Sequence, residues 1–194
     1  MKNWKAWAEE RKPIAKRLDV AKFLEDIAAE IQSESEASQG EAFLELAAAL
    51  RTELAADGAP SAVPPTSAHV AGLLRLAEEM LHDDPLPAMM LATHFFYDCQ
   101  APDSAYPHAL RSVEKAKRQQ ELLRQTTGEL IRICLQLERY EEIEPLLLLL
   151  TEYEPKEGAL DVFLESDFLS RLPAGTISPA VMQGYRNKLS SKRS

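Results

Sequence analysis

Apolar residues recur at intervals of three and four positions along most of this chain, which is the period of an amphipathic α-helix. The clearest early example follows Asp19, a residue suited to capping a helix, and its apolar face consists of Val20, Phe23, Leu24, Ile27 and Ile31. Upstream, Pro13 is expected to interrupt the helix that carries Trp4 and Trp7, because proline lacks a backbone donor. The N-terminal region therefore predicts a short helix followed by a longer amphipathic one.

A polar stretch over 33–40 predicts a break before a third helix. Ser38 and Glu41 have the spacing of a capping box, and Gly58 is placed to end the helix in a left-handed turn. The apolar face between them consists of Phe43, Leu46, Ala47, Leu50 and Leu54. The prolines and glycine of 57–67 then predict the main linker.

Two further helices are expected after the linker. Thr66 or Ser67 can cap the first, whose apolar face consists of Val70, Leu73, Leu74, Ala77, Met80 and Leu81. Asp84 and Pro85 open the second, since proline suits a first helical turn. Its apolar stripe consists of Ala88, Leu91, Ala92, Phe95 and Cys99.

An internal repeat is the most informative pattern in the sequence. Tyr106 and Tyr140 are 34 residues apart, and each is followed by apolar residues at offsets of 3, 7 and 10, on one helical face. The resulting pairs are Ala109 with Ile143, Val113 with Leu147, and Ala116 with Leu150. A period of 34 residues with paired helices is typical of a helical solenoid.

The residues of 130–155 resemble a tetratricopeptide repeat. Its first-helix packing positions are taken by Leu130, Ile131 and Cys134, and its second-helix positions by Tyr140, Ile143, Leu147, Leu150 and Pro155. The preceding unit, over 86–120, resembles it through Tyr106, Ala109, Val113 and Ala116. Glu138 stands where the family usually has glycine and Ile143 where it usually has alanine, and Pro145 requires the second helix to start late. The resemblance implies protein–protein interaction.

The end of the chain is expected to close this array. Apolar residues between Gly158 and Leu172 predict a capping helix, which covers the last exposed face of a solenoid. Ser178 and Pro179 predict a final helix before a basic tail. The expected fold class is all-α, a TPR-like helical-hairpin array with an N-terminal helical segment over 1–58, a repeat region over 66–172 and a terminal helix and tail over 173–194, packed as one compact unit.

Composition excludes several classes of protein. A chain with 45% hydrophobic residues can bury a sizeable core, and a net charge of −9 argues against general nucleic-acid binding. Two cysteines exclude a disulfide scaffold and a four-thiolate zinc site. With no run of 18 apolar residues and no secretory signal at the N-terminus, the expected location is cytoplasmic, without a membrane span.

The sequence contains no recognisable catalytic, cofactor or metal site. The four histidines lack metal-ligand spacing, and no glycine-rich phosphate loop or nucleophile elbow occurs. Cys99 and Cys134 are expected to be buried packing residues, because a catalytic cysteine needs a positioned base and only distant histidines are expected. We therefore expect no enzyme activity, no cofactor and no bound metal.

Acidic residues are concentrated near the C-terminal part of the repeat region. The 30 residues of 138–167 contain ten carboxylates against only Arg139 and Lys156. We call this segment the acidic face and expect it to bind a basic partner. The carboxylates expected to make the contact are Glu138, Glu141, Glu142, Glu144, Glu152 and Glu154. Alternatively, these carboxylates pair within the chain with Arg111, Lys115 and Arg118. A solubilising role is the other interpretation.

The expected function is a non-catalytic protein-binding module that holds its partner in a groove or on the acidic face. An adaptor, a chaperone and a toxin-neutralising immunity protein all fit this description, and the partner is expected to be a protein, basic at the contact, such as a toxin domain. The alternatives are an enzyme with an unrecognised site between helices and a self-assembling structural subunit. The oligomeric state stays open.

Overall fold

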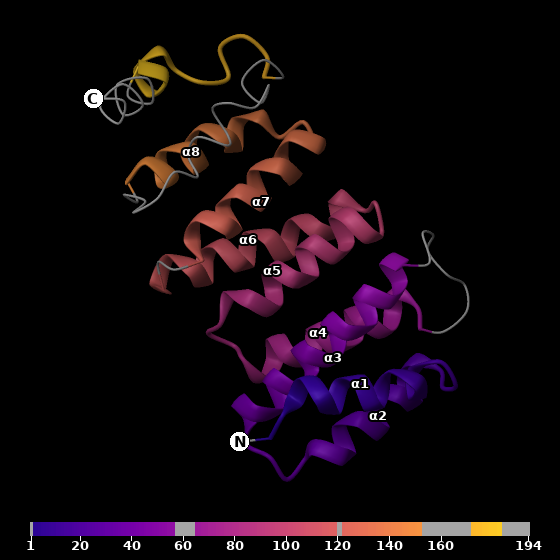
Figure 1. Cartoon of the computed structure of the whole chain (residues 1–194). Helices are drawn as coiled ribbons and strands as arrows, with labels where there is room; N and C mark the ends of the chain where they lie inside the picture. Colours follow the sequence, from indigo (N-terminus) through magenta and orange to yellow (C-terminus); the bar gives the residue numbers. More distant parts are fainter. Residues whose placement is uncertain (1, 57–64, 120–121, 153–171, 184–194) are drawn as a thin grey trace.

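The computed structural model of the protein describes residues 2–56, 65–119, 122–152 and 172–183, and in these ranges the regular secondary structure is helical throughout (Figure 1). The all-α prediction is thus confirmed for the described residues. The elements are α1 (Trp4–Ala15), α2 (Val20–Ile31), α3 (Glu36–Ala56), α4 (Ser67–Met80), α5 (Pro85–Thr93), the π-helix η1 (His94–Asp98), α6 (Pro102–Gln119), α7 (Leu123–Gln136), the 3-10 turn η2 (Tyr140–Glu142) and α8 (Ile143–Glu152). None of these helices is both long and apolar enough to cross a membrane.

The helices are stacked in the order of the chain, from the indigo N-terminal end to the yellow C-terminal segment (Figure 1). Each of α3 to α7 packs mainly on its neighbours in sequence, and α1 also packs on α3 and α2 on α4. Helix α5 likewise contacts α7. Contacts between elements one or two places apart in the chain therefore hold the described part of the molecule together.

Local sequence signals set several helix boundaries as predicted. Asp19 caps α2 by accepting a hydrogen bond from Lys22 N (2.9 Å), and Asp84 caps α5 through Leu86 N (2.8 Å). Thr66 and His69 form a capping box at the start of α4. Helix α8 begins at Ile143, which places Pro145 in its first turn, where a proline is tolerated.

One predicted break is wrong, and a second, before α3, is present over residues 32–35 but is shorter than predicted. Helix α1 continues through Pro13 to Ala15, although proline cannot donate a backbone hydrogen bond to the preceding turn, and the helix ends two residues later. Helix α3 begins at Glu36 rather than after Ser38, since Ser35 Oγ accepts from Ser38 N (3.3 Å). Gly40 consequently lies inside α3, where an added Cβ would collide with the Leu81 side chain. This glycine serves close helix packing rather than a break.

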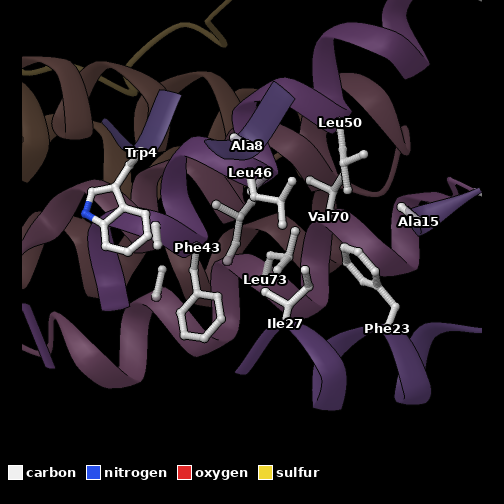
Figure 2. Close-up of a cluster of buried hydrophobic side chains, with 14 of the residues drawn as sticks. Trp4, Ala8, Ala15, Phe23, Ile27, Phe43, Leu46, Leu50, Val70 and Leu73 are labelled. Atoms are coloured by element: carbon white, nitrogen blue, oxygen red, sulfur yellow. The ribbon is translucent and has the colours of Figure 1, made fainter. Parts of the chain in front are cut away.

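The N-terminal core fills the space between α1, α2, α3 and α4 (Figure 2). Its central side chains are less than 2% exposed, and they include Phe23, Ile27, Phe43, Leu46, Leu50 and Leu73. Trp4 and Trp7 pack edge to face, and the Trp7 indole donates to Glu30 Oε1 (2.8 Å). Arg11 also binds this carboxylate, so Glu30 fixes α1 to α2.

A second core lies between α5, α6, α7 and α8 and contains the repeated positions. All three aligned pairs are buried: Ala109 and Ile143, Val113 and Leu147, Ala116 and Leu150. Tyr106 and Tyr140 both pack at the edge of this core. Their backbones differ, however, because Tyr106 lies within α6 whereas Tyr140 opens the 3-10 turn before α8.

The described residues include only part of the C-terminal segment for which helices were predicted. Residues 179–183 are helical, as expected after Ser178, and Leu172, Ile177 and Val181 pack against the second core. Ser178 N donates to Glu144 Oε2 (2.8 Å), which joins this segment to α8. The predicted turn at Gly58, most of the linker, the capping helix up to residue 171 and the basic tail lie outside the described residues.

One half-buried carboxylate, that of Glu78, connects α4 to α6. Glu78 accepts hydrogen bonds from Arg111 Nε (3.0 Å) and Lys115 Nζ (3.5 Å), and His108 Nδ1 lies 3.8 Å from it, a distance too long for a strong hydrogen bond. The approach of His108, together with Arg111 and Lys115, lowers the pKa of Glu78 to about 2 against the opposing effect of burial. The native state therefore favours the ionised carboxylate.

This shift predicts a pH-dependent contribution to stability. Because the pKa of Glu78 falls from 4.5 to about 2 on folding, its contribution is complete above about pH 4.5 and is lost as the pH falls toward 2. We expect Glu78→Gln to lower the free energy of unfolding by about 2 kcal/mol at pH 7, the size of hydrogen bonds to charged groups. In urea titrations, the difference between the two proteins should shrink below about pH 4.5 and vanish only as the pH falls to about 2 and below, and a difference independent of pH would contradict the assignment.

Candidate functional site

A surface pocket of about 520 Å³ lies between the end of the α5–η1 segment and the end of α7. Its lining residues combine aromatic, apolar and hydrogen-bonding side chains: Phe96, Tyr97, Arg132, Leu135, Gln136 and Tyr140. Phe96 and Tyr97 pack edge to face, with ring centroids 4.9 Å apart. The pocket thus joins the two helical hairpins that carry the internal repeat.

Tyr97 is the most exposed aromatic side chain of the pocket, with 44% of its surface accessible. Its hydroxyl donates to Glu129 Oε2 (3.0 Å), and Arg132 Nη1 donates to Glu129 Oε1 (2.5 Å). Burial and the neighbouring Glu129 carboxylate raise the pKa of Tyr97 above its ordinary value. The hydroxyl is therefore a neutral donor held in a fixed direction, and Glu129 balances the charge of Arg132 at the pocket wall.

A polar cluster lies between α6, α7 and η2. Glu142 accepts hydrogen bonds from the Tyr106 hydroxyl (2.5 Å) and Arg139 Nη1 (3.1 Å), and the Cys134 thiol points at it from 3.9 Å. The Arg139 guanidinium lies over the Tyr106 ring, 4.1 Å from its centroid. Burial, followed by the nearby Glu142, raises the pKa of both Tyr106 and Cys134 to about 12. Tyr106 and Cys134 are therefore neutral and sit beside the Glu142–Arg139 ion pair, which is typical of a structural cluster.

The predicted acidic residues divide into two groups in the structure. Glu138 and Glu141 are exposed and flank Tyr140 of the pocket in sequence. Glu142 and Glu144 are partly buried and hold neighbouring segments through Tyr106, Arg139 and Ser178 N. Glu154 lies outside the described residues, and the structure does not describe the side chain of Glu152.

The basic residues of α6 have partners other than the acidic face. Arg111 and Lys115 bind Glu78, and Arg118 lies 3.6 Å from Asp83. Both acidic partners belong to α4 and the turn after it. Among the described residues, these bases therefore pair with Glu78 and Asp83 and not with the carboxylates near α8.

The two cysteines differ, and one expectation about them was wrong. Cys134 is buried, as predicted, whereas Cys99 is partly exposed at the end of η1. Cys99 Sγ lies 3.7 Å from Nε2 of His94, a histidine five residues away. The extra residue of the π-helical turn brings these two side chains together, which an ordinary α-helical spacing does not indicate. Among the described residues, no group of three histidine, cysteine or acidic side chains is arranged to hold a metal ion.

Most of the pocket residues could not be identified from the sequence. Phe96, Tyr97, Arg132 and Gln136 lie off the predicted apolar stripes of the helices. The available signal was the pair of consecutive aromatic residues after Phe95, because successive side chains on a helix point about 100° apart and three in a row cannot all be centred on one apolar stripe.

Comparison of the chain with protein-family models, curated proteins and solved structures found no match.

Proposed function

We propose that this protein is a non-catalytic binding module that holds a basic segment of a partner protein in the pocket between η1 and α7. The observation that carries the proposal is the exposed aromatic surface of Tyr97 in a pocket between two hairpins, with Phe96 and Tyr140 beside it. Exposed tyrosines in such hollows contribute a large share of the energy of protein interfaces.

The charge of the surroundings supports a basic partner. Glu138 and Glu141 are exposed next to Tyr140, and the whole chain carries a net charge of −9. Glu129 offsets the positive charge of Arg132, the charged residue that lines the pocket. A lysine or arginine side chain can therefore lie against the aromatic rings, where a cation is attracted to the face of the π-system.

The TPR-like solenoid arrangement belongs to this proposal. Two features support it: the aligned repeat positions are all buried in one core, and contacts connect elements one or two places apart in the chain. Glu138, at the position where the family usually has glycine, has a left-handed backbone with φ of 57°. Position 138 therefore has the left-handed backbone conformation that glycine adopts most easily. Helical-repeat proteins commonly bind their partners along one extended surface.

Selection from a random peptide library displayed on phage, with the full-length protein as bait, tests the proposal. We expect the selected peptides to contain lysine or arginine, and Tyr97→Ala to weaken their affinity at least about thirtyfold, the threshold of an interface hot spot. Fluorescence anisotropy of a labelled selected peptide measures this loss. Replacing Glu138 and Glu141 by Gln should slow association at low salt and have less effect at high salt.

Leu110→Ala is the matched control, because Leu110 is similarly exposed (39%) but lies on α6, outside the pocket lining. The Leu110→Ala variant should bind the same peptides with unchanged affinity. If the wild-type protein and Tyr97→Ala bound every selected peptide with equal affinity, the pocket would not be the binding site. Selection of peptides without basic residues would overturn the proposed charge of the partner.

A further inference from the structure

A chain of polar side chains leads from the partly exposed thiol of Cys99 into the joint between α3, α4 and α5. Cys99 Sγ lies 3.7 Å from His94 Nε2, and His94 Nδ1 lies 2.9 Å from Asp98 Oδ2. Asp98 also accepts two hydrogen bonds from the Arg51 guanidinium of α3. The thiol is therefore the outer end of a connected set of titratable and charged groups.

Each ring nitrogen of His94 faces a hydrogen-bond acceptor. Nδ1 lies 2.9 Å from the Asp98 carboxylate, and Nε2 lies 3.1 Å from the backbone carbonyl of Ser67. The side chain is fully buried, so these protein groups are the partners available to a proton on either nitrogen. Nε2 also lies 3.7 Å from Cys99 Sγ, which places a proton on Nε2 within hydrogen-bonding range of the sulfur.

The backbone holds this geometry in place. Cys99 N donates to His94 O (3.1 Å), which closes the π-helical turn and places residues five apart on the same side. Arg51 Nη1 additionally donates to Thr93 Oγ1 (3.1 Å), so Arg51 joins α3 to the end of α5 as well as to Asp98 of η1. His94 is thus faced by Asp98, by the Ser67 carbonyl of α4 and by Cys99, and the Asp98 carboxylate is shared between His94 and the Arg51 guanidinium.

We propose that Cys99 is a reactive thiol whose thiolate is paired with the His94 imidazolium and is oxidised by hydrogen peroxide. The sulfur attacks one peroxide oxygen, so that an S–O bond forms and the O–O bond breaks. The departing hydroxide takes the Nε2 proton of His94 and leaves as water. The products are a cysteine sulfenic acid, with sulfur oxidised by two electrons, and one molecule of water. A neighbouring imidazolium is the arrangement that makes protein thiols nucleophilic.

Competition between the protein and glutathione for iodoacetamide at pH 6.5, read by mass spectrometry of peptides, tests the nucleophilicity. We expect Cys99 to be alkylated about tenfold faster than glutathione, because thiolate is scarce in an ordinary thiol at that pH. Cys134 is the control within the same molecule, since it is buried, with a pKa raised to about 12, and should stay unmodified. A Cys99 rate no higher than that of glutathione overturns the proposal.

A second measurement tests the peroxide chemistry. Treatment with hydrogen peroxide and dimedone should label Cys99 and leave Cys134 unlabelled, and rapid alkylation without dimedone labelling would refute the oxidation step. His94→Gln should lower the alkylation rate of Cys99 about tenfold, in a protein whose circular dichroism shows that it remains folded. Since that variant can loosen the buried joint, the wild-type competition decides the outcome if the variant unfolds.

Discussion

Leu147→Ala is expected to lower the free energy of unfolding by about 2–5 kcal/mol, the range for a buried leucine whose site collapses only partly. Leu147 is 2% exposed and packs in the second core. It belongs to α8, which has α7 as its main helical neighbour among the described residues. The loss should appear as a lower urea midpoint with an unchanged dependence on urea, since the same surface is exposed on unfolding.

The adjacent residue supplies the matched control. Leu148 is 41% exposed, so Leu148→Ala removes the same atoms from the same helix without opening a cavity. Its effect should stay within about 0.5 kcal/mol, as for other surface substitutions. Equal losses in the two variants would show that Leu147 is not a core residue. They would also undermine the repeat alignment, which pairs Leu147 with Val113.

The helices could be predicted from the sequence because their periodicity and caps act locally. The aspartates at positions 19 and 84 each cap a helix through their own side chains, and neither needs a distant partner. The start of α3 could not be predicted with the same accuracy. Ser35 and Ser38 are equally good caps on local grounds, and the close packing of Gly40 against Leu81 comes from another helix. The helix that starts from the Ser35 cap includes Gly40, and the packing of Gly40 against Leu81 is a signal that the local sequence does not contain.

The candidate site was harder to predict because it depends on residues that local patterns do not connect. Phe96 and Arg132 belong to different hairpins and meet only when the hairpins stack. The π-helical turn at His94–Asp98 adds one residue to the helical repeat, so spacing by three and four gave no indication that His94 faces Cys99. The acidic residues were predicted to form one face. Their separation into exposed Glu138 and Glu141 and internally bonded Glu142 depends on where Tyr106 lies.

The largest polar effect is expected from Asp98→Ala. Asp98 accepts hydrogen bonds from Arg51 of α3 and from His94, and the His94 ring is completely buried. Removing the Asp98 carboxylate leaves the Arg51 guanidinium and the buried His94 ring without their shared acceptor at the junction of α3 with η1. Leaving charged groups unpaired in this way costs more than the hydrogen bonds themselves contribute. We expect a loss of about 3 kcal/mol in the free energy of unfolding.

Asp26→Ala is the control for loss of a carboxylate. Asp26 pairs with Lys22 on the surface of α2, with 44% of its side chain exposed, and exposed pairs of this spacing contribute only about 0.3–0.5 kcal/mol. Urea unfolding should therefore separate the two variants clearly. Hydrogen exchange adds a spatial test, because Asp98→Ala should speed amide exchange around η1 and the part of α3 near Arg51, whereas Asp26→Ala should leave both unchanged. Similar small losses in the two variants would mean that Arg51 and His94 find other acceptors, and that the joint between α3 and η1 does not depend on Asp98.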